Sequence, residues 1–516
     1  MTHRSSVVSW LALCLAIAGC RAGAVPPATM GDAGVQTADD GGAIDPIDDP
    51  DAGEAPAASF RVSAASHAVV VRRNESATLE LTIDRDAGYD ATLAITIEGL
   101  PEHVQASAPA GVAGESATIT FSAEAIAQPG EAPITVRVAD GDDAVALELF
   151  VVTPGDAGAT DESFGTGGIA ANEEATYSVV GLASDELGRI YTTYGALDGD
   201  TVGVFVRRLD RRGQADATWN GGAPSRVPLS SGSGLALGGI VVDDDGRVVL
   251  LVSASVEGTQ HAFLAVLDAS GAPLEGGARD LGAYGARGLD RAGDRIAALL
   301  STSDDAGSTS VLQVYEDLAA EPVITRELPS MLGSDVLVDA SGRFVVIGSD
   351  LAASAGVVVR VDAEGAIDST FAAGRRAITS DGTVMLVAGG LMHDGSLLVV
   401  GREGAHPFAA RVDDAGELVD GFGTAGGRMR YDAISGGFRG VDVDRATGEA
   451  IAVGDRDANA LLIGDITGGG ALDPTFVPPA EVTGLQAAIA VAMTSDRRVL
   501  VGSSDGERGS VVRLWR

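Results

Sequence analysis

The chain contains 516 residues and carries a formal net charge of −38 at pH 7, from 73 acidic and 35 basic residues. A surface this acidic repels phosphate backbones, which argues against nucleic acid as a partner, and a high net charge favours solubility. The 70 glycines and the aromatic fraction of 4% indicate many tight turns and small side chains, as in an all-β protein. The length is sufficient for two or more separate cores.

Residues 1–19 have the three parts of an export signal peptide. Arg4 with His3 gives a short basic start, and residues 7–18 form a mostly apolar run. This run is too short to span a bilayer, which needs roughly 20 residues. Ile17-Ala18-Gly19-Cys20 follows directly, and this tetrad resembles the lipobox of bacterial lipoproteins.

The lipobox resemblance implies that, after cleavage, the mature chain begins at Cys20 and carries a diacylglycerol and an N-acyl chain there. Several acyl chains anchor a protein firmly, whereas one anchors it only reversibly. Arg21, in place of Asp, favours the outer membrane under the sorting rule of enterobacterial lipoproteins. We therefore predict a lipid-anchored cell-envelope protein whose first partner is the membrane. The alternative is an ordinary signal peptide in which Cys20 falls by chance.

Cysteine usage agrees with this prediction. The only other cysteine, Cys14, lies inside the removed segment. The mature chain then has a single thiol that is committed to lipid, so neither an intrachain disulfide nor a Cys-based metal site is expected.

Residues 20–58 are predicted to be a disordered linker. Ala, Gly, Asp and Pro dominate it, as in residues 39–51, and like charges with prolines prevent a packed core. Its aspartates offer loose Ca²⁺ binding but lack the spacing of an EF-hand loop. A solvated spacer is therefore favoured, and no cofactor is assigned.

Residues 59–153 are predicted to form an Ig-like β-sandwich, because apolar residues alternate with period two between turn clusters. Residues 99–104 and 129–136 resemble phrases of bacterial Ig-like modules, although the Cys…Trp…Cys pattern of antibody domains is missing. The expected strands are residues 68–71, 78–83, 92–97, 104–107, 118–122, 134–138 and 145–152.

Residues 154–516 contain internal repeats. In the first phrase, an Asp-rich turn leads through Gly and, in most copies, Arg into an apolar run; seven copies begin at Ser184, Val242, Leu289, Val338, His393, Asp444 and Thr494. In the second phrase an apolar strand runs into another turn, as in residues 205–210 and 357–362. In the third phrase an aromatic residue follows Asp161, Asp216, Asp368, Asp420 and Asp473 at short range.

Together these phrases resemble the delta-60 repeat, which implies a β-propeller; seven copies imply seven blades. A strand-turn-strand unit repeated about every 50 residues without helical patterning agrees with that fold. Because the third phrase occurs at residue 161 and is missing after the last unit, residues 161–168 are expected to supply the outer strand of the final blade. This closes the ring and removes its edges. An open solenoid is the alternative.

No catalytic or metal-binding residue is assigned from the sequence. The repeated aspartates and aromatics are interpreted as turn and packing residues. Residues 502–506 match G-x-S-x-G, but a strand follows where a nucleophile elbow needs a helix, so a hairpin turn is expected. His261, His393 and His406 lack metal-ligand spacing, and His393 is expected in a turn.

The sequence favours a non-enzymatic lipoprotein that presents a β-propeller for envelope structure or for binding a protein or glycan. The alternative is an enzyme with an axial active site: a lyase, a hydrolase or a quinone-dependent dehydrogenase. That alternative requires non-repeated His, Arg or Asp residues to converge from different blades at one mouth of the channel. A third hypothesis is an adhesion module stabilised by Ca²⁺.

Overall fold

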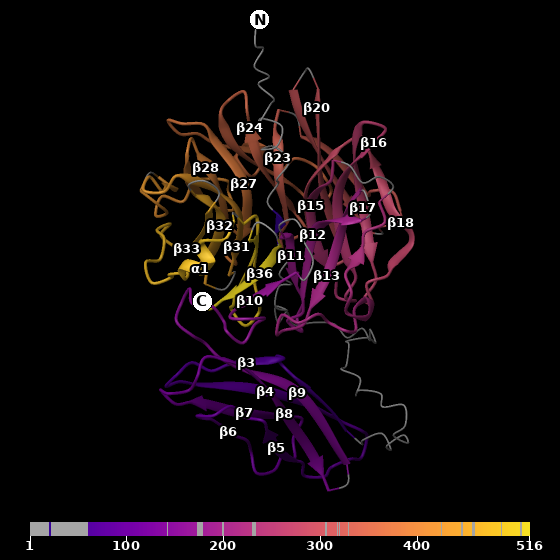
Figure 1. Cartoon of the computed structure of the whole chain (residues 1–516), viewed down its shortest axis with the longest axis vertical. Coiled ribbons are helices and arrows are strands. Elements are labelled where there is room, and N and C mark those ends of the chain that lie inside the picture. Colours follow the sequence, from indigo (N-terminus) through magenta and orange to yellow (C-terminus); the bar gives the residue numbers. More distant parts are fainter. Residues whose placement is uncertain are drawn as a thin grey trace, which may run out of the picture. The chain divides into compact units, whose positions relative to one another are not determined.

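The computed structural model describes residues 20–21 and 60–516, apart from residues 142, 173–178, 199–200, 230–233, 305–306, 317, 319, 329, 425, 445–446, 457–459, 487 and 506–507. The described chain is all-β; its helical segments are α1 (Ala480–Thr483) and two 3₁₀ turns, Asn220–Gly222 and Ala372–Gly374. It divides into two compact units, residues 25–156 and residues 1–24 with 157–516 (Figure 1). The expected signal peptide and residues 22–58 of the expected linker lie outside the described residues. No helix within the described part is long and apolar enough to cross a membrane.

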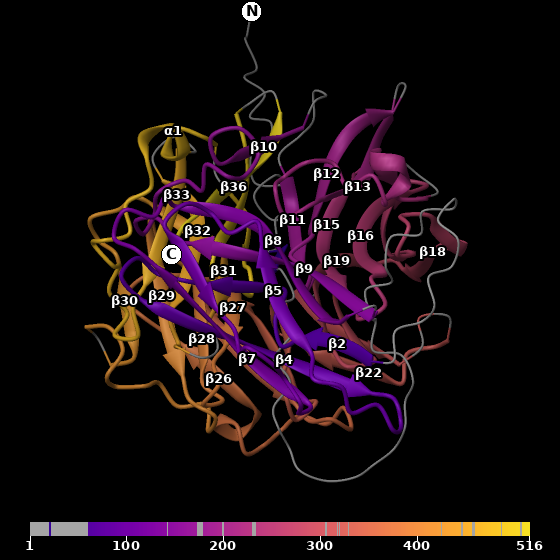
Figure 2. The same cartoon turned by 90° about the horizontal axis from the view of Figure 1, so that it is seen from below.

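The smaller unit consists of two four-stranded sheets around one core (Figure 2). Leu81 and Phe121 of one sheet share this core with Val136 and Val151 of the other. All seven expected strands are present, and residues 60–64 add an eighth that the sequence patterns did not reveal. The sheets are β2 (Phe60–Ala64), β4 (Ser76–Arg85), β7 (Ser116–Ala123) and β6 (Val104–Ser107), and β3 (Ala68–Val70), β9 (Asp143–Thr153), β8 (Gly130–Asp140) and β5 (Ala94–Glu98).

The larger unit contains seven antiparallel sheets, each named below by its first strand. Their strands are β11 (Val179–Ser184), β12 (Ile190–Asp198), β13 (Thr201–Leu209) and β14 (Ser225–Arg226); β15 (Ala236–Val242), β16 (Val248–Val256), β17 (Thr259–Leu267) and β18 (Pro273–Gly282); β19 (Gly285–Ala292), β20 (Arg295–Asp304), β21 (Gly307–Tyr315) and β22 (Ile324–Leu328); β23 (Leu332–Val338), β24 (Phe344–Asp350), β25 (Ala355–Val361) and β26 (Arg375–Ile378); β27 (Val384–Leu391), β28 (Leu397–Glu403), β29 (His406–Val412) and β30 (Arg428–Arg430); β31 (Gly436–Val443), β32 (Ala450–Arg456) and β33 (Ala460–Ile466); and β34 (Ala490–Met493), β35 (Val499–Ser504), β36 (Gly509–Leu514) and β10 (Ile169–Ala171).

The seven sheets pack against one another through their first strands. These contact one another in the order β11, β15, β19, β23, β27, β31 and β34, and β34 in turn contacts β11. The second strands are apolar on both faces because each sheet has a neighbour on both sides. In β16, residues 248–254 are all buried, which is the pattern of a fully buried strand and differs from the alternation of the smaller unit.

One further short strand, β1 (Cys20–Arg21), lies beside the last sheet. Cys20 and Arg21 pair in parallel with Ala490 and Val491 of β34. β1 also contacts the first strands β11, β15, β19 and β31.

The repeated aspartates occupy turns, as the sequence predicted. In the first phrase the Asp185 carboxylate accepts hydrogen bonds from the backbone N–H of Arg189 at 2.9 Å and from its Nε at 2.6 Å. In the second phrase Asp210 Oδ1 accepts from the backbone N–H groups of Arg212 and Gln214. Such bonds satisfy backbone donors that a tight turn leaves exposed.

The third phrase works together with an arginine of the second phrase. Arg208 Nε donates to Asp216 Oδ2 at 2.7 Å, and the Arg208 guanidinium lies 5.0 Å from the ring centroid of Trp219. The same arrangement joins Arg360 to Asp368 at 2.7 Å, with Phe371 at 4.8 Å. Each of these two units therefore combines a charge-assisted hydrogen bond with a cation–π contact.

In the last sheet this arginine is Arg513, and its aspartate comes from the beginning of the unit. Asp161 Oδ2 lies 2.8 Å from Arg513 Nε and 3.0 Å from the Arg498 guanidinium, and all three side chains are buried. Asp496 extends the cluster: it pairs with Arg498 at 2.5 Å and with Arg211 of the β11 sheet at 2.6 Å. This set, Asp161, Arg211, Asp496, Arg498 and Arg513, is called the closure cluster below.

The outer strand of the last sheet comes from the same early segment. β10 pairs antiparallel with β36, Ile169 with Val512 and Ala171 with Ser510. The prediction of a strand at residues 161–168 was wrong in its bounds: residues 162–165 form turns and the strand follows at Ile169–Ala171. The physical reason is that the Asp161 carboxylate accepts the Ser163 N–H, which turns the chain before the strand begins.

Replacing Asp161 by Asn should destabilise the larger unit strongly. The Asp161→Asn variant leaves Arg498 and Arg513 buried with one fewer counter-charge, and loss of one partner of a buried ion pair costs about 3–5 kcal/mol. Chemical denaturation would measure this change in the free energy of unfolding. The same change at the partly exposed equivalent, Asp473→Asn, is the control. An equal loss in both variants would contradict the role of the closure cluster.

The closure cluster should also make stability depend on acid pH. Burial alone would raise the pKa of Asp496, but the charges of Arg498 and Arg211 and hydrogen bonds from Arg498 and Thr494 outweigh burial and lower this pKa well below its ordinary value. A carboxyl group with a lowered folded-state pKa contributes stability above its unfolded pKa, about 3.9, and loses that contribution as the pH falls further. Denaturation curves between pH 7 and pH 2.5 should therefore show a steeper loss below pH 4 in the natural chain than in Asp496→Asn. Parallel curves would refute this role.

Candidate ligand-binding pocket

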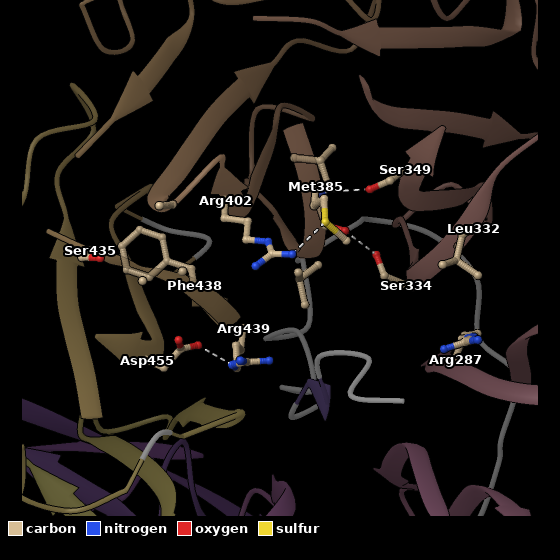
Figure 3. Close-up of a pocket in the computed structure, with 16 residues that line it drawn as sticks. Arg287, Leu332, Ser334, Ser349, Met385, Arg402, Ser435, Phe438, Arg439 and Asp455 are labelled. Carbon is tan, nitrogen blue, oxygen red and sulfur yellow. Dashed lines mark hydrogen bonds and ion pairs between the residues drawn. The ribbon is translucent and has the colours of Figure 1, made fainter. Parts of the chain in front are cut away.

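A pocket of about 310 Å³ lies where four consecutive sheets of the larger unit meet (Figure 3). Its walls come from β19, from β23 and β24, from β27 and β28, and from β31 and β32. The volume is at the lower end of the range for small-molecule sites. The lining residues are Arg287, Leu332, Gly333, Ser334, Ser349, Met385, Leu386, Val387, Arg402, Ala405, Ser435, Gly436, Gly437, Phe438, Arg439 and Asp455.

A repeated backbone irregularity redirects one side chain in most of the first strands. Six of the seven first strands contain a one-residue bulge at the same place in the sheet, and a bulge re-aims the side chain that it carries. The last four of these bulge residues all line the pocket. In chain order the six are Val180, Gly238, Arg287, Ser334, Val387 and Arg439.

Two bulges share a sequence phrase, Arg-Gly-aliphatic-Asp, at residues 287–290 and 439–442. The glycine permits close packing of the next sheet, because a Cβ on Gly288 would lie 2.9 Å from the backbone N of Val336. The aspartate accepts a hydrogen bond from that sheet: Asp290 from the Val338 N–H at 2.8 Å and Asp442 from the Met493 N–H at 2.7 Å. The phrase thus fixes the two arginines on backbone that is anchored to a neighbouring sheet.

A second repeated position also reaches the pocket. In five consecutive sheets, the first-strand residue two positions before the bulge pairs with an equivalent residue of the second strand. From the β15 sheet to the β31 sheet, this second-strand residue is Ser253, Ser301, Ser349, Arg402 and Asp455 in turn. Serine is therefore the residue that repeats at this position. Arg402 and Asp455 replace it in two sheets, and both of these side chains line the pocket.

The serines of the pocket are committed to the backbone. Ser349 Oγ accepts the Leu386 N–H at 3.1 Å, and Ser334 Oγ donates to the Leu386 carbonyl at 2.9 Å. Leu386 precedes the bulge in β27, so these bonds satisfy backbone groups near the interrupted ladder. The two hydroxyls therefore join the β23 and β27 sheets and are not poised as nucleophiles.

The three arginines of the pocket differ in what they contact. Arg439 pairs with Asp455 at 2.5 Å. Arg402 forms no ion pair with any described residue; its hydrogen bond runs to the thioether of Met385 at 3.2 Å, which is a weak acceptor. Arg287 Nε donates to Ser301 Oγ at 2.6 Å, and burial lowers the pKa of its guanidinium. Figure 3 shows Arg402 and Arg439 on adjacent walls and Arg287 across the pocket.

Glycines hold the wall between Arg402 and Arg439 in place. Gly436 has φ +137°, and its N–H donates to the Ala405 carbonyl at 2.8 Å. A Cβ on Gly437 would lie 3.2 Å from Cβ of Arg402, so the arginine stem lies directly over this residue. Arg402 thereby crosses from the β27 sheet to the β31 sheet.

The electrostatics of the pocket reverse those of the whole chain. Three arginines and one carboxylate line it, whereas acidic residues outnumber basic ones by 73 to 35 overall. Guanidinium groups match carboxylates and phosphates geometrically, so the arrangement is suited to an anion. In the described residues no group of three or more His, Cys, Asp or Glu side chains is arranged to hold a metal ion.

The residues considered from the sequence lie apart from this pocket. His261 contacts Asp280 at 2.9 Å between β17 and β18, His393 lies in a turn as expected, and His406 Nδ1 lies 2.8 Å from the Ile434 carbonyl. Ser504 ends β35 and pairs with Gly509 of β36, so the G-x-S-x-G match is the expected hairpin. Cys20 lies in β1.

Sequence reasoning missed Arg287, Arg402, Arg439 and Asp455. The available signal was the Arg-Gly-aliphatic-Asp phrase, which occurs twice, and the replacement of a repeated serine at residues 402 and 455. Both signals require the sheets to be aligned by register, which the turn phrases alone do not give.

No protein-family model matches the chain, and no curated protein matches it in sequence. Among solved structures it is similar to domains 4 and 5 of the S-layer protein SbsC, with 18% identity and a TM-score of 0.15 over 18% of this chain and 50% of that one. A quinonprotein alcohol dehydrogenase-like protein from Bacteroides thetaiotaomicron has 12% identity and a TM-score of 0.33, over 87% and 96%. Prolyl oligopeptidase B from Galerina marginata has 9% identity and a TM-score of 0.35, over 80% and 55%. The chain spans half the length of the first of these, and likenesses this low assign no function.

Replacing Arg402 by Gln should leave stability almost unchanged. Arg402 is exposed and has no ionic partner among the described residues, and substitutions at such positions stay within about 0.5 kcal/mol. Thermal unfolding of Arg402→Gln beside the natural chain measures this. A large drop in Tm would mean that the arginine maintains the fold.

Proposed function

We propose that this protein is a lipid-anchored cell-envelope lipoprotein, placed in the outer membrane, whose larger unit is a closed seven-bladed β-propeller of the delta-60 type and binds a ligand without transforming it. The smaller unit is an Ig-like sandwich that serves as a spacer. The propeller proposal is supported by the seven sheets, by the contacts of their first strands and by the contribution of β10 to the last sheet. The Ig-like proposal is supported by two four-stranded sheets around one core.

The observation that carries the binding function is the gathering of non-repeated charges at one pocket. A residue needed by every blade for stability recurs in every blade, whereas a residue needed for one ligand occurs once. Arg402 and Asp455 interrupt a row of serines, and both line the pocket. Charged residues that depart from the repeat therefore mark the ligand site.

Binding is favoured over catalysis because the chemical groups of the pocket are already engaged. Asp455 is held by Arg439, and the hydroxyls of Ser334 and Ser349 bond to the backbone. A general base must be free to accept a proton, and a hydroxyl nucleophile must lie beside a base that takes its proton. Arg402, in contrast, has donors to offer to an anion, because its hydrogen bond runs to the weakly accepting thioether of Met385.

The anchor proposal rests on the lipobox at Cys20 and has a structural consequence. Cys20 pairs with Ala490 in β1, and a lipid-bearing cysteine embedded in a bilayer cannot remain in that pairing. The anchored form therefore requires β1 to leave β34.

Metabolic labelling tests the anchor. Radiolabelled palmitate should be incorporated into the natural chain and into Cys14→Ala, whose changed residue lies in the removed segment. Cys20→Ala should lose the label and leave the membrane fraction. Label that persists in Cys20→Ala would disprove the anchor.

A thermal-shift screen of neutral sugars, organic acids, amines and short peptides tests the binding function. A ligand of the pocket should raise the Tm of the natural chain and raise that of Arg402→Gln much less, because only ligands that bind the folded state stabilise it. If every stabilising compound acts equally on both proteins, the pocket is not the binding site.

A further inference from the structure

The charge and lining of the pocket define the chemistry of its ligand more closely than the proposed function does. We infer that the pocket binds a small organic anion, with a carboxylate head group held by Arg402 and Arg439 and a short apolar body. This inference rests on the proposed binding function and adds the class of ligand to it.

The anionic head group follows from Arg402. A guanidinium has five N–H donors in a planar fork that binds carboxylates through two parallel hydrogen bonds. The Arg402 side chain lies over Gly437, which holds its stem against the β31 sheet, and its described polar contact is a thioether sulfur. A carboxylate is a far stronger acceptor for these donors.

Arg439 provides the second cation, and Asp455 competes for it. The two side chains pair at 2.5 Å and both are partly buried. The carboxylate of Asp455 therefore occupies the kind of contact that a ligand carboxylate would make. It also means that an arriving anion meets a negative charge next to its binding groups, which lowers affinity.

The apolar body follows from the remaining walls. Leu332, Met385, Leu386 and Val387 line the pocket beside the arginines, and the hydroxyls of Ser334 and Ser349 are committed to the backbone. An inorganic phosphate would find few further donors for its remaining oxygens and would leave the apolar walls hydrated. A carboxylate attached to a short alkyl chain covers these walls and keeps both oxygens on the arginines.

The test compares three probes by saturation-transfer NMR titration of the purified full chain. Hexanoate has the head group and the apolar body, hexanol has the body alone, and inorganic phosphate has the charge alone. Hexanoate should bind with an affinity on the order of millimolar, as expected for so small a molecule. Hexanol and phosphate should bind at least ten-fold more weakly.

Three variants separate a binding role from a structural one. Arg402→Gln should weaken hexanoate binding about ten-fold or more through loss of a charge-assisted contact. Asp455→Asn should tighten it several-fold, because it removes the competing carboxylate, whereas a merely structural Asp455 would give weaker binding when replaced. Arg247→Gln removes one positive charge from an exposed turn and should leave the affinity unchanged.

The outcomes distinguish this inference from the proposed function. Hexanol or phosphate binding as well as hexanoate, with loss in Arg402→Gln, would overturn the carboxylate class and leave binding at the pocket intact. Equal hexanoate affinity in the natural chain, Arg402→Gln and Asp455→Asn would place the hexanoate elsewhere and overturn the inference. If the natural chain shows a cooperative thermal unfolding transition, and is therefore folded, but does not bind hexanoate, the inference is also overturned.

Discussion

The buried carboxylate of Asp161 joins the two ends of the larger unit. Two arginines of the last sheet, Arg498 and Arg513, lie within 3.0 Å of it, and the hydrogen bond between Asp161 and Arg498 spans 337 residues of sequence. The equivalent arginine–aspartate pairs are local: Arg360 and Asp368, like Arg208 and Asp216, are eight residues apart. The same chemistry that stabilises a turn in the other sheets therefore holds the beginning of the larger unit against its last sheet here, and the pair of Asp496 with Arg211 joins that sheet to the β11 sheet.

Charge has a dual use in this molecule. On the exposed surface, the excess of aspartate and glutamate favours solubility. Aspartate side chains there also accept hydrogen bonds from the backbone N–H groups of turns. In the interior, carboxylates are paired with arginine or with backbone N–H groups, as Asp290 and Asp442 are, because an unpaired buried charge is costly. The pocket is different since its arginines exceed its carboxylates. The chain has no lysine, so each of these cations is a planar fork that can select a planar anion.

Much of the fold was predictable from the sequence because turns carry strong local signals. The Asp-rich phrases located the hairpins, and period-two alternation located seven of the eight strands in the smaller unit; Phe60–Ala64 was missed next to the linker. The pocket was not predictable. Arg287 and Arg439 reach it through bulges, and a bulge changes strand register without a reliable local signal. Arg402 becomes conspicuous only beside Ser301 and Ser349, a comparison that requires knowing which strand residues are equivalent.

The bulges of the first strands separate the residues that maintain strand pairing from residues that line the inner surface. A residue within a strand ladder must suit its cross-strand neighbours, so its replacement disturbs pairing. The bulge residue has no such partner, and the six examples include valine, glycine, serine and arginine. Two of these positions are nevertheless constrained: a Cβ on Gly238 would lie 2.9 Å from the backbone N of Arg287, and the Ser334 hydroxyl bonds to the Leu386 carbonyl. Val387 and Arg439 line the pocket without such a constraint on the backbone, so mutation there can change what the inner surface recognises without disturbing strand pairing.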